Sequence, residues 1–96
     1  SYITYYEWMS DVKGERQGVI TMVYDHDHRG LMQTISEIQH ENRETIQSTL
    51  HAHVNDERCL EVILVRGDGA KLKEVAEKLM ALKGVESVKL TTIPIN

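Results

Sequence analysis

Residues 45–66 are the most informative part of the sequence for the fold, and they read T-I-Q-S-T-L-H-A-H-V-N-D-E-R-C-L-E-V-I-L-V-R. Residues 45–54 alternate in period two, with Ile46, Leu50 and Val54 among the even-numbered positions. This alternation predicts a β-strand, and residues 59–66 form a second apolar, β-rich run. The polar connection N-D-E-R, residues 55–58, then predicts a turn, so the whole stretch predicts an antiparallel hairpin.

The same alternation narrows the register of the hairpin. Residues directly opposite each other in an antiparallel pair lie on one face, so even-numbered residues must pair with even-numbered ones. The simplest pairing places His53 opposite Cys59 and His51 opposite Glu61, and a shift by two residues would keep the same faces. In either register, we expect His51, His53 and Cys59 to share a face near the turn, within reach of one ion.

Four more elements flank the hairpin. Residues 18–24 and 85–95 are β-rich, and residues 29–40 and 70–82 carry the apolar stripe of amphipathic helices. The order β-α-β-β-α-β predicts an α+β, ferredoxin-like sandwich: a four-stranded antiparallel sheet with two helices on one face. We expect the helices to cover the even-numbered face of the hairpin. The odd-numbered face, with Ile63 and Val65, would stay open for subunit stacking.

Composition limits the classes of function. A hydrophobic fraction of 41% and a charged fraction of 27% indicate a folded chain. The net charge of −4 is the wrong sign for a chain that binds nucleic acid by itself. No apolar run approaches the roughly 20 residues of a membrane span. The single cysteine cannot form an internal disulfide, so we expect a reducing, cytoplasmic location.

The candidate ligands are imidazoles and a thiolate, which suit borderline-soft metal ions. Glu61 lies beside them and fits the carboxylate that accepts the second N–H of a metal-bound imidazole. The alternative is coincidence, since a lone Cys is usually a small buried hydrophobe and a lone His a surface residue. The cluster Asp25-His26-Asp27-His28 is open to the same two interpretations, as a secondary metal site or as a solvated loop.

His40 ends the first predicted helix, where the helix dipole favours an imidazole without any metal. Because we expect this helix on the side of the sheet opposite the candidate ligands, His40 should not reach the site of its own chain. If His40 is a ligand, it would therefore come from another subunit.

The motifs Gln39-His40, His51-Ala52-His53 and Cys59-Leu60-Glu61 resemble those of the nickel-responsive regulator family. The stretches V-Y-D-H (23–26), G-D-G (67–69) and K-G-V (83–85) match as well, so that the resemblance covers about residues 18–94. It implies a ferredoxin-like fold of the ACT type, a homotetramer, and one square-planar Ni(II) per chain. The implied ligands are His51, His53 and Cys59 of one subunit and His40 of another, with Glu61, Gln39 and Tyr24 around them.

The resemblance also implies partners. Family members carry an N-terminal ribbon-helix-helix domain that binds operator DNA. We expect residues 1–17 to be a remnant of its last helix plus a linker, and residues 18–96 to be the regulatory domain. Nickel binding in the family orders the segment matching residues 29–43 and represses nickel uptake. A family potassium site would be incomplete here, since it needs carboxylates from the DNA-binding domain.

The donor types alone do not select the metal. Planar coordination suits Ni(II) or Cu(II), whereas the same ligands in a tetrahedron suit Zn(II). Affinity should fall in acid, because the ligands must lose their protons. The alternative function is an ACT-type module that binds an amino acid. An enzyme ranks last, because four protein ligands leave no open position for a substrate.

Overall fold

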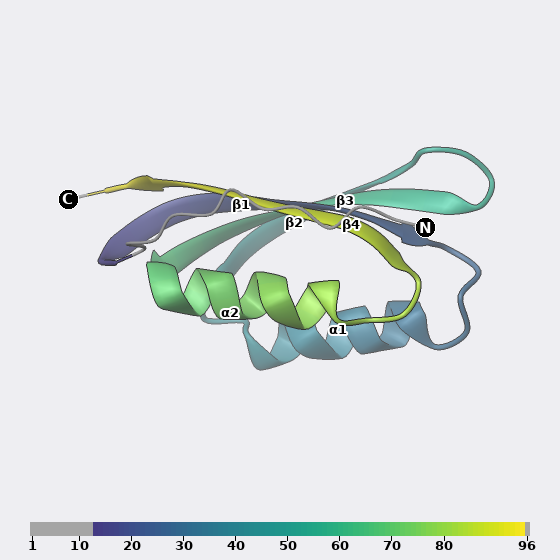
Figure 1. Ribbon diagram of the computed structural model, residues 1–96, viewed down its shortest axis with the longest axis horizontal. Helices are drawn as coiled ribbons and strands as arrows, with labels where there is room; N and C mark the ends of the chain where they lie inside the picture. The colour runs from purple at the N-terminus through teal and green to yellow at the C-terminus, as the bar shows by residue number, and fades with distance from the viewer. Residues whose placement is uncertain (1–12, 96) are drawn as a thin grey trace.

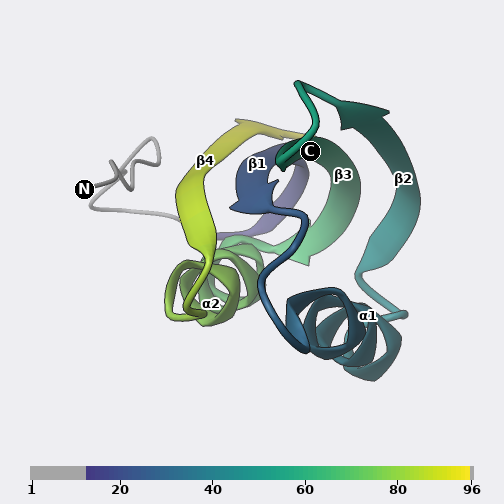
Figure 2. The same cartoon turned by 90° about the vertical axis from the view of Figure 1, so that its right-hand side faces the viewer.

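The computed structural model describes residues 13–95. The elements are β1 (Glu15–Asp25), α1 (Leu31–Glu41), β2 (Ile46–His53), β3 (Arg58–Asp68), α2 (Gly69–Met80) and β4 (Val85–Pro94). The strands form one antiparallel sheet in the order β2-β3-β1-β4. Both helices lie on the same face of this sheet (Figures 1 and 2). The predicted α+β, ferredoxin-like order is therefore confirmed.

The ends of the elements differ from the predicted ranges by a few residues. β1 begins at Glu15, so the end of the expected linker belongs to the sheet. The helix expected at the start of the chain lies outside the described residues. No helix within residues 13–95 is both long and apolar enough to cross a membrane.

The hairpin register is the predicted one at the end that carries the candidate ligands. His53 pairs with Cys59 and His51 pairs with Glu61. At the other end of β2 the register shifts, so that Ile46 pairs with Val65 while Ser48 pairs with Leu64. Strict alternation predicts that Ile46 and Ser48 share a face. Because of the register shift, they do not.

The prediction about which face the helices cover was wrong. Cys59, Ile63 and Val65 have no exposed surface, whereas Leu50 is 72% exposed. The helices thus cover the odd-numbered face of the hairpin, and the even-numbered face is open. The reason lies in β1, whose largest apolar side chains, Ile20 and Met22, pair with the odd-numbered residues of β3. Burying this face removes more apolar surface from water than burying the face of Val19 and Thr21 would.

Candidate metal centre

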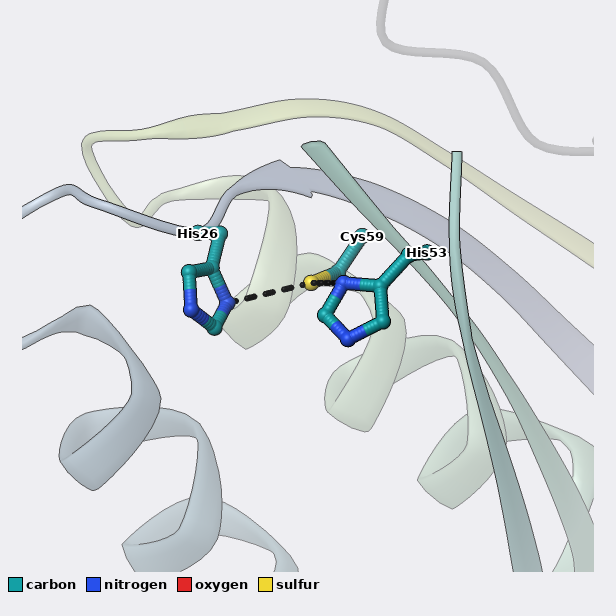
Figure 3. A group of neighbouring side chains, drawn as sticks. All are labelled: His26, His53 and Cys59. Carbon is teal, nitrogen blue, oxygen red and sulfur yellow. Dashed lines mark hydrogen bonds between the residues drawn. The ribbon is translucent and has the colours of Figure 1, made fainter. Parts of the chain in front are cut away.

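The site lies under the end of the sheet where β1 and β2 finish and β3 begins. Figure 3 shows two imidazoles on either side of the Cys59 sulfur. Its Sγ is 3.3 Å from Nδ1 of His26 and 3.7 Å from Nδ1 of His53. Among residues 13–95, these three form the one group of three or more His, Cys, Asp or Glu residues whose ligand atoms all lie within 4.8 Å of one another.

His26 is the residue that sequence reasoning did not place in the site. Its backbone N–H donates to the carbonyl of Glu57 at 2.7 Å, which prolongs the pairing of Tyr24 with Cys59 past the end of β1. Period two then puts His26 on the same side as Tyr24. This signal was present in the V-Y-D-H stretch, but the backbone path of the following loop could not be read from the sequence.

His51 lies next to the three-residue group without belonging to it. Its ring contacts the His53 ring edge-on, with 5.6 Å between ring centroids. Its Nδ1 lies 4.0 Å from Oε1 of Glu61, and the His51 side chain is 37% exposed. His51 is thus close to a carboxylate that can orient its imidazole, which is the role predicted for Glu61.

Glu61 is a buried carboxylate with partners from two other elements. The Gln39 amide of α1 donates to Oε2, and the Tyr24 hydroxyl lies 3.4 Å from Oε1. Burial first, and then the negative charges of Glu61 and Cys59, raise the pKa of the Tyr24 phenol well above its ordinary value. The phenol therefore stays protonated and can donate to the carboxylate. These hydrogen bonds offset the cost of burying Glu61, and they join α1 to the site.

His40 does not join the group, but the predicted reason for this was wrong. We expected α1 on the far side of the sheet, and it covers the same face as the site (Figure 2). Successive residues of an α-helix point about 100° apart, so when Gln39 turns inward to Glu61, its neighbour His40 is exposed. The structure thus brings His53 and Cys59 together, with His51 beside them and His40 on the outer surface.

The donor set fits a divalent transition metal. Two imidazole nitrogens and a thiolate are ligands for Ni(II), Cu(II) and Zn(II). Cys59 is fully buried while His53 is exposed, so solvent reaches the group from the side of the β2–β3 turn. Of the cluster Asp25-His26-Asp27-His28, His26 is the residue that belongs to the metal-ligand group.

Comparison with known proteins agrees with this chemistry. Residues 17–93 match the family described as the NikR C terminal nickel binding domain. A protein of Methanocella arvoryzae named as a nickel-responsive regulator is 55% identical over the whole chain, which covers 69% of that protein. One from Methanothrix thermoacetophila, named likewise, is 54% identical over 99% of this chain and 68% of its own length.

Solved structures support the fold alone. An uncharacterized Thermotoga maritima protein aligns with a TM-score of 0.69 at 20% identity, covering 86% of this chain and all of that one. The ACT domain of a Chlorobium tepidum GTP pyrophosphokinase also gives 0.69, at 18% identity, covering 81% of this chain and all of that domain. The ACT-type architecture is confirmed, and these likenesses carry no ligand over to this chain.

Proposed function

Because this chain belongs to the nickel-responsive regulators and contains their C-terminal nickel-binding domain, we propose that it senses Ni(II) for a DNA-binding transcriptional repressor. The family is one of regulators, so the chain is not an enzyme. The observation that carries the proposal is the contact of the buried Cys59 sulfur with His53, beside His51, within a domain of this family.

The nickel ligands in this proposal are His51, His53 and Cys59 of one subunit and His40 of another. The His53 imidazole already contacts the Cys59 sulfur and the ring of His51, and Glu61 lies where it can accept the second N–H of His51. His40 is exposed on the outer surface of α1 and is therefore accessible to a neighbouring subunit. One Ni(II) per chain follows from this ligand set, and Cu(II) would suit the same donors.

The signal passes from the metal to α1 through Glu61. When His51 binds nickel, its imidazole must turn toward Cys59 while keeping its second N–H near the Glu61 carboxylate. The same carboxylate accepts the amide of Gln39 in the last turn of α1. Metal binding therefore holds in place the Glu61 carboxylate that accepts the hydrogen bond of Gln39. For this reason, the order of α1 depends on nickel.

Assembly and DNA binding complete the proposal. A ligand from a second subunit makes the metal site an interface, consistent with a homotetramer of regulatory domains in the cytoplasm. Operator DNA would be bound by an N-terminal domain, to which residues 1–17 would connect. The net charge of −4 favours this division, because a phosphate backbone needs basic groups.

The ligand set is tested by nickel titration of the native chain and of Cys59→Ala. We expect one Ni(II) per chain with a thiolate-to-nickel charge-transfer absorbance, and the loss of both in the variant. His28→Ala is the matched control, because His28 lies in the same loop as His26 but outside the group. Unchanged affinity and spectrum in Cys59→Ala would refute the proposal.

The role of His40 is tested by subunit mixing. His40→Ala chains are combined with chains carrying His51→Ala, His53→Ala and Cys59→Ala together, and neither should bind nickel tightly alone. A mixed oligomer should recover sites, since one subunit supplies three ligands and the other supplies His40. If no mixture recovers any site, the ligands are not shared between chains.

A further inference from the structure

We propose that Asn42, which directly follows α1, is a positioning residue: its buried side chain holds the last turn of α1 so that His40 points to the neighbouring subunit. The inference rests on the proposed function, because His40 needs a fixed direction only if it is a ligand for another subunit. Asn42 acts through backbone atoms of α1, and not by contact with the metal.

The side chain of Asn42 is buried, although asparagine side chains are mostly exposed in proteins. Asn42 is 4% exposed, and its Nδ2 donates to the carbonyl of Ile38 at 2.7 Å. Its backbone N–H lies 3.1 Å from the same carbonyl and 3.2 Å from that of Gln39. Carbonyls in the last turn of a helix lack partners within the helix, so the two N–H donors of Asn42 complete the end of α1.

The backbone conformation does not explain why residue 42 is an asparagine. Asparagine is common just after a helix because it tolerates a left-handed conformation. Asn42 instead has φ of −114° and ψ of 26°, so the left-handed region is not used. The side-chain amide is therefore what matters at this position, since it reaches back to the carbonyl four residues earlier and donates to it.

Asn42 also connects the end of α1 to the sheet. Its carbonyl accepts the N–H groups of Thr45 at 2.9 Å and of Ile46, the first residue of β2, at 3.1 Å. Thr45 is buried too, and its carbonyl accepts the N–H of Arg66 in β3 at 2.9 Å. The second half of α1 has no fully buried apolar residue, and its end is held by hydrogen bonds that lead through two buried polar residues to β3.

The direction of His40 follows from this attachment. His40 is exposed and lies within the turn that the bond from Asn42 to Ile38 closes. Successive residues of a helix point about 100° apart, so a turn fixed in place directs His40 outward while Gln39 faces Glu61. If the turn frays, His40 loses its direction, and nickel binding must then supply the free energy that orders it.

Subunit mixing with Asn42→Asp in one chain at a time tests the inference. His40→Ala chains supply His51, His53 and Cys59, and chains that lack these three ligands supply His40. Asn42→Asp keeps the shape of the side chain but cannot donate to a carbonyl. In the chain that supplies His40, we expect it to weaken nickel binding by about tenfold, measured by competition with a chelator. In the other chain, the change should be less than about threefold, whereas a general loss of stability would affect both placements alike.

Two further variants separate the lost donor from the new charge. Asn42→Ser has a hydroxyl that can donate to the carbonyl four residues earlier, so it should bind nickel more tightly than Asn42→Asp. Gln33→Glu makes the same change from amide to carboxylate at an exposed position of α1, and it should keep native affinity. Circular dichroism shows whether each metal-free chain is folded, and Asn42→Ala takes the place of an unfolded Asn42→Asp.

An equal change of affinity in the two placements of Asn42→Asp would overturn the inference. Native affinity when Asn42→Asp lies in the chain that supplies His40 would overturn it as well. In both cases the mixture with Asn42 intact still recovers sites, so the proposed function stands. If that mixture recovers no site, His40 is not shared between chains, and the proposed ligand set fails together with the inference that depends on it.

Discussion

The two helices cover the same face of the sheet and have nearly the same length, 11 residues in α1 and 12 in α2, but they are anchored differently. α2 buries five residues against the sheet: Gly69, Leu72, Val75, Ala76 and Leu79. α1 buries only Leu31 and Ile35, both in its first half. The second half of α1, which carries Gln39 and His40, therefore has much less apolar anchorage.

The N-terminus of α2 is also better stabilised than that of α1. The Asp68 carboxylate accepts the N–H of Ala70 at 3.1 Å and so caps α2. α1 follows Gly30, which has φ of +77° and supplies no side-chain cap. The difference shows which element a ligand can control: a helix with few buried contacts opens at low free-energy cost, and a single buried hydrogen bond can shift that balance.

The largest expected difference between the helices is in the stability lost when a buried side chain is truncated. Leu72→Ala in α2 is expected to lower the free energy of unfolding by about 2–5 kcal/mol, as for a fully buried leucine. Ile35→Ala should fall at or below the low end of that range, because α1 can detach without opening the rest of the core. Urea unfolding of the metal-free chains measures both. An equal or greater loss for Ile35→Ala would remove the distinction between the helices.

The Glu61 carboxylate should matter for nickel, whereas an exposed carboxylate of α2 should not. Glu61→Gln keeps the shape but loses the charge that orients His51, and we expect nickel affinity to fall by about 10–100-fold. Glu74→Gln is the matched control, since Glu74 pairs with Lys71 and Lys78 on the exposed surface of α2. Competition titrations should find native affinity in Glu74→Gln, and native affinity in Glu61→Gln would contradict the route through Glu61.

The helix starts give a smaller effect. Asp68→Ala should cost about 1 kcal/mol of stability, because the first turn of α2 loses its cap. Gly30→Ala should cost a similar amount, about 1–2 kcal/mol, for a different reason: a Cβ at this positive φ is strained, although it would meet no atom within 4 Å. Gly30→Asn should recover part of that loss, and thermal unfolding compares the three. A Gly30→Ala variant more stable than the native chain would show that residue 30 does not adopt a positive φ at the start of α1.

The sequence predicted which residues of the hairpin pair, but not which face of the sheet the helices cover. Alternation determines which residues share a face, so His53 opposite Cys59 and His51 opposite Glu61 could be deduced from residues 45–66 alone. Which face the helices cover depends on the side chains that β1 and β4 add, and both faces of the hairpin contain apolar residues. Leu60 and Val62 suggested that the helices cover the even-numbered face of the hairpin. The bulk of Ile20 and Met22 instead favours burial of the odd-numbered face.

The site was predictable to the same degree. Cys59, His53 and Glu61 lie on regular strands, and their grouping followed from period two. His26 lies just beyond the last residue of β1, where the strand pairing continues through one more hydrogen bond before the chain turns. Contacts made by a loop or by the last turn of a helix, such as that of Gln39 with Glu61, depend on the packing of whole elements, and no local pattern encodes them.

Hydrogen exchange of the backbone amides in α1 and α2, with and without nickel, measures directly whether the order of α1 depends on the metal. In the metal-free chain, the amides of α1 should exchange much faster than those of α2. Saturating nickel should narrow that difference in the native chain and leave it unchanged in Cys59→Ala. Equal exchange of the two helices without metal, or an α1 rate that nickel does not alter, would contradict the claim that α1 reports the metal bound at Cys59.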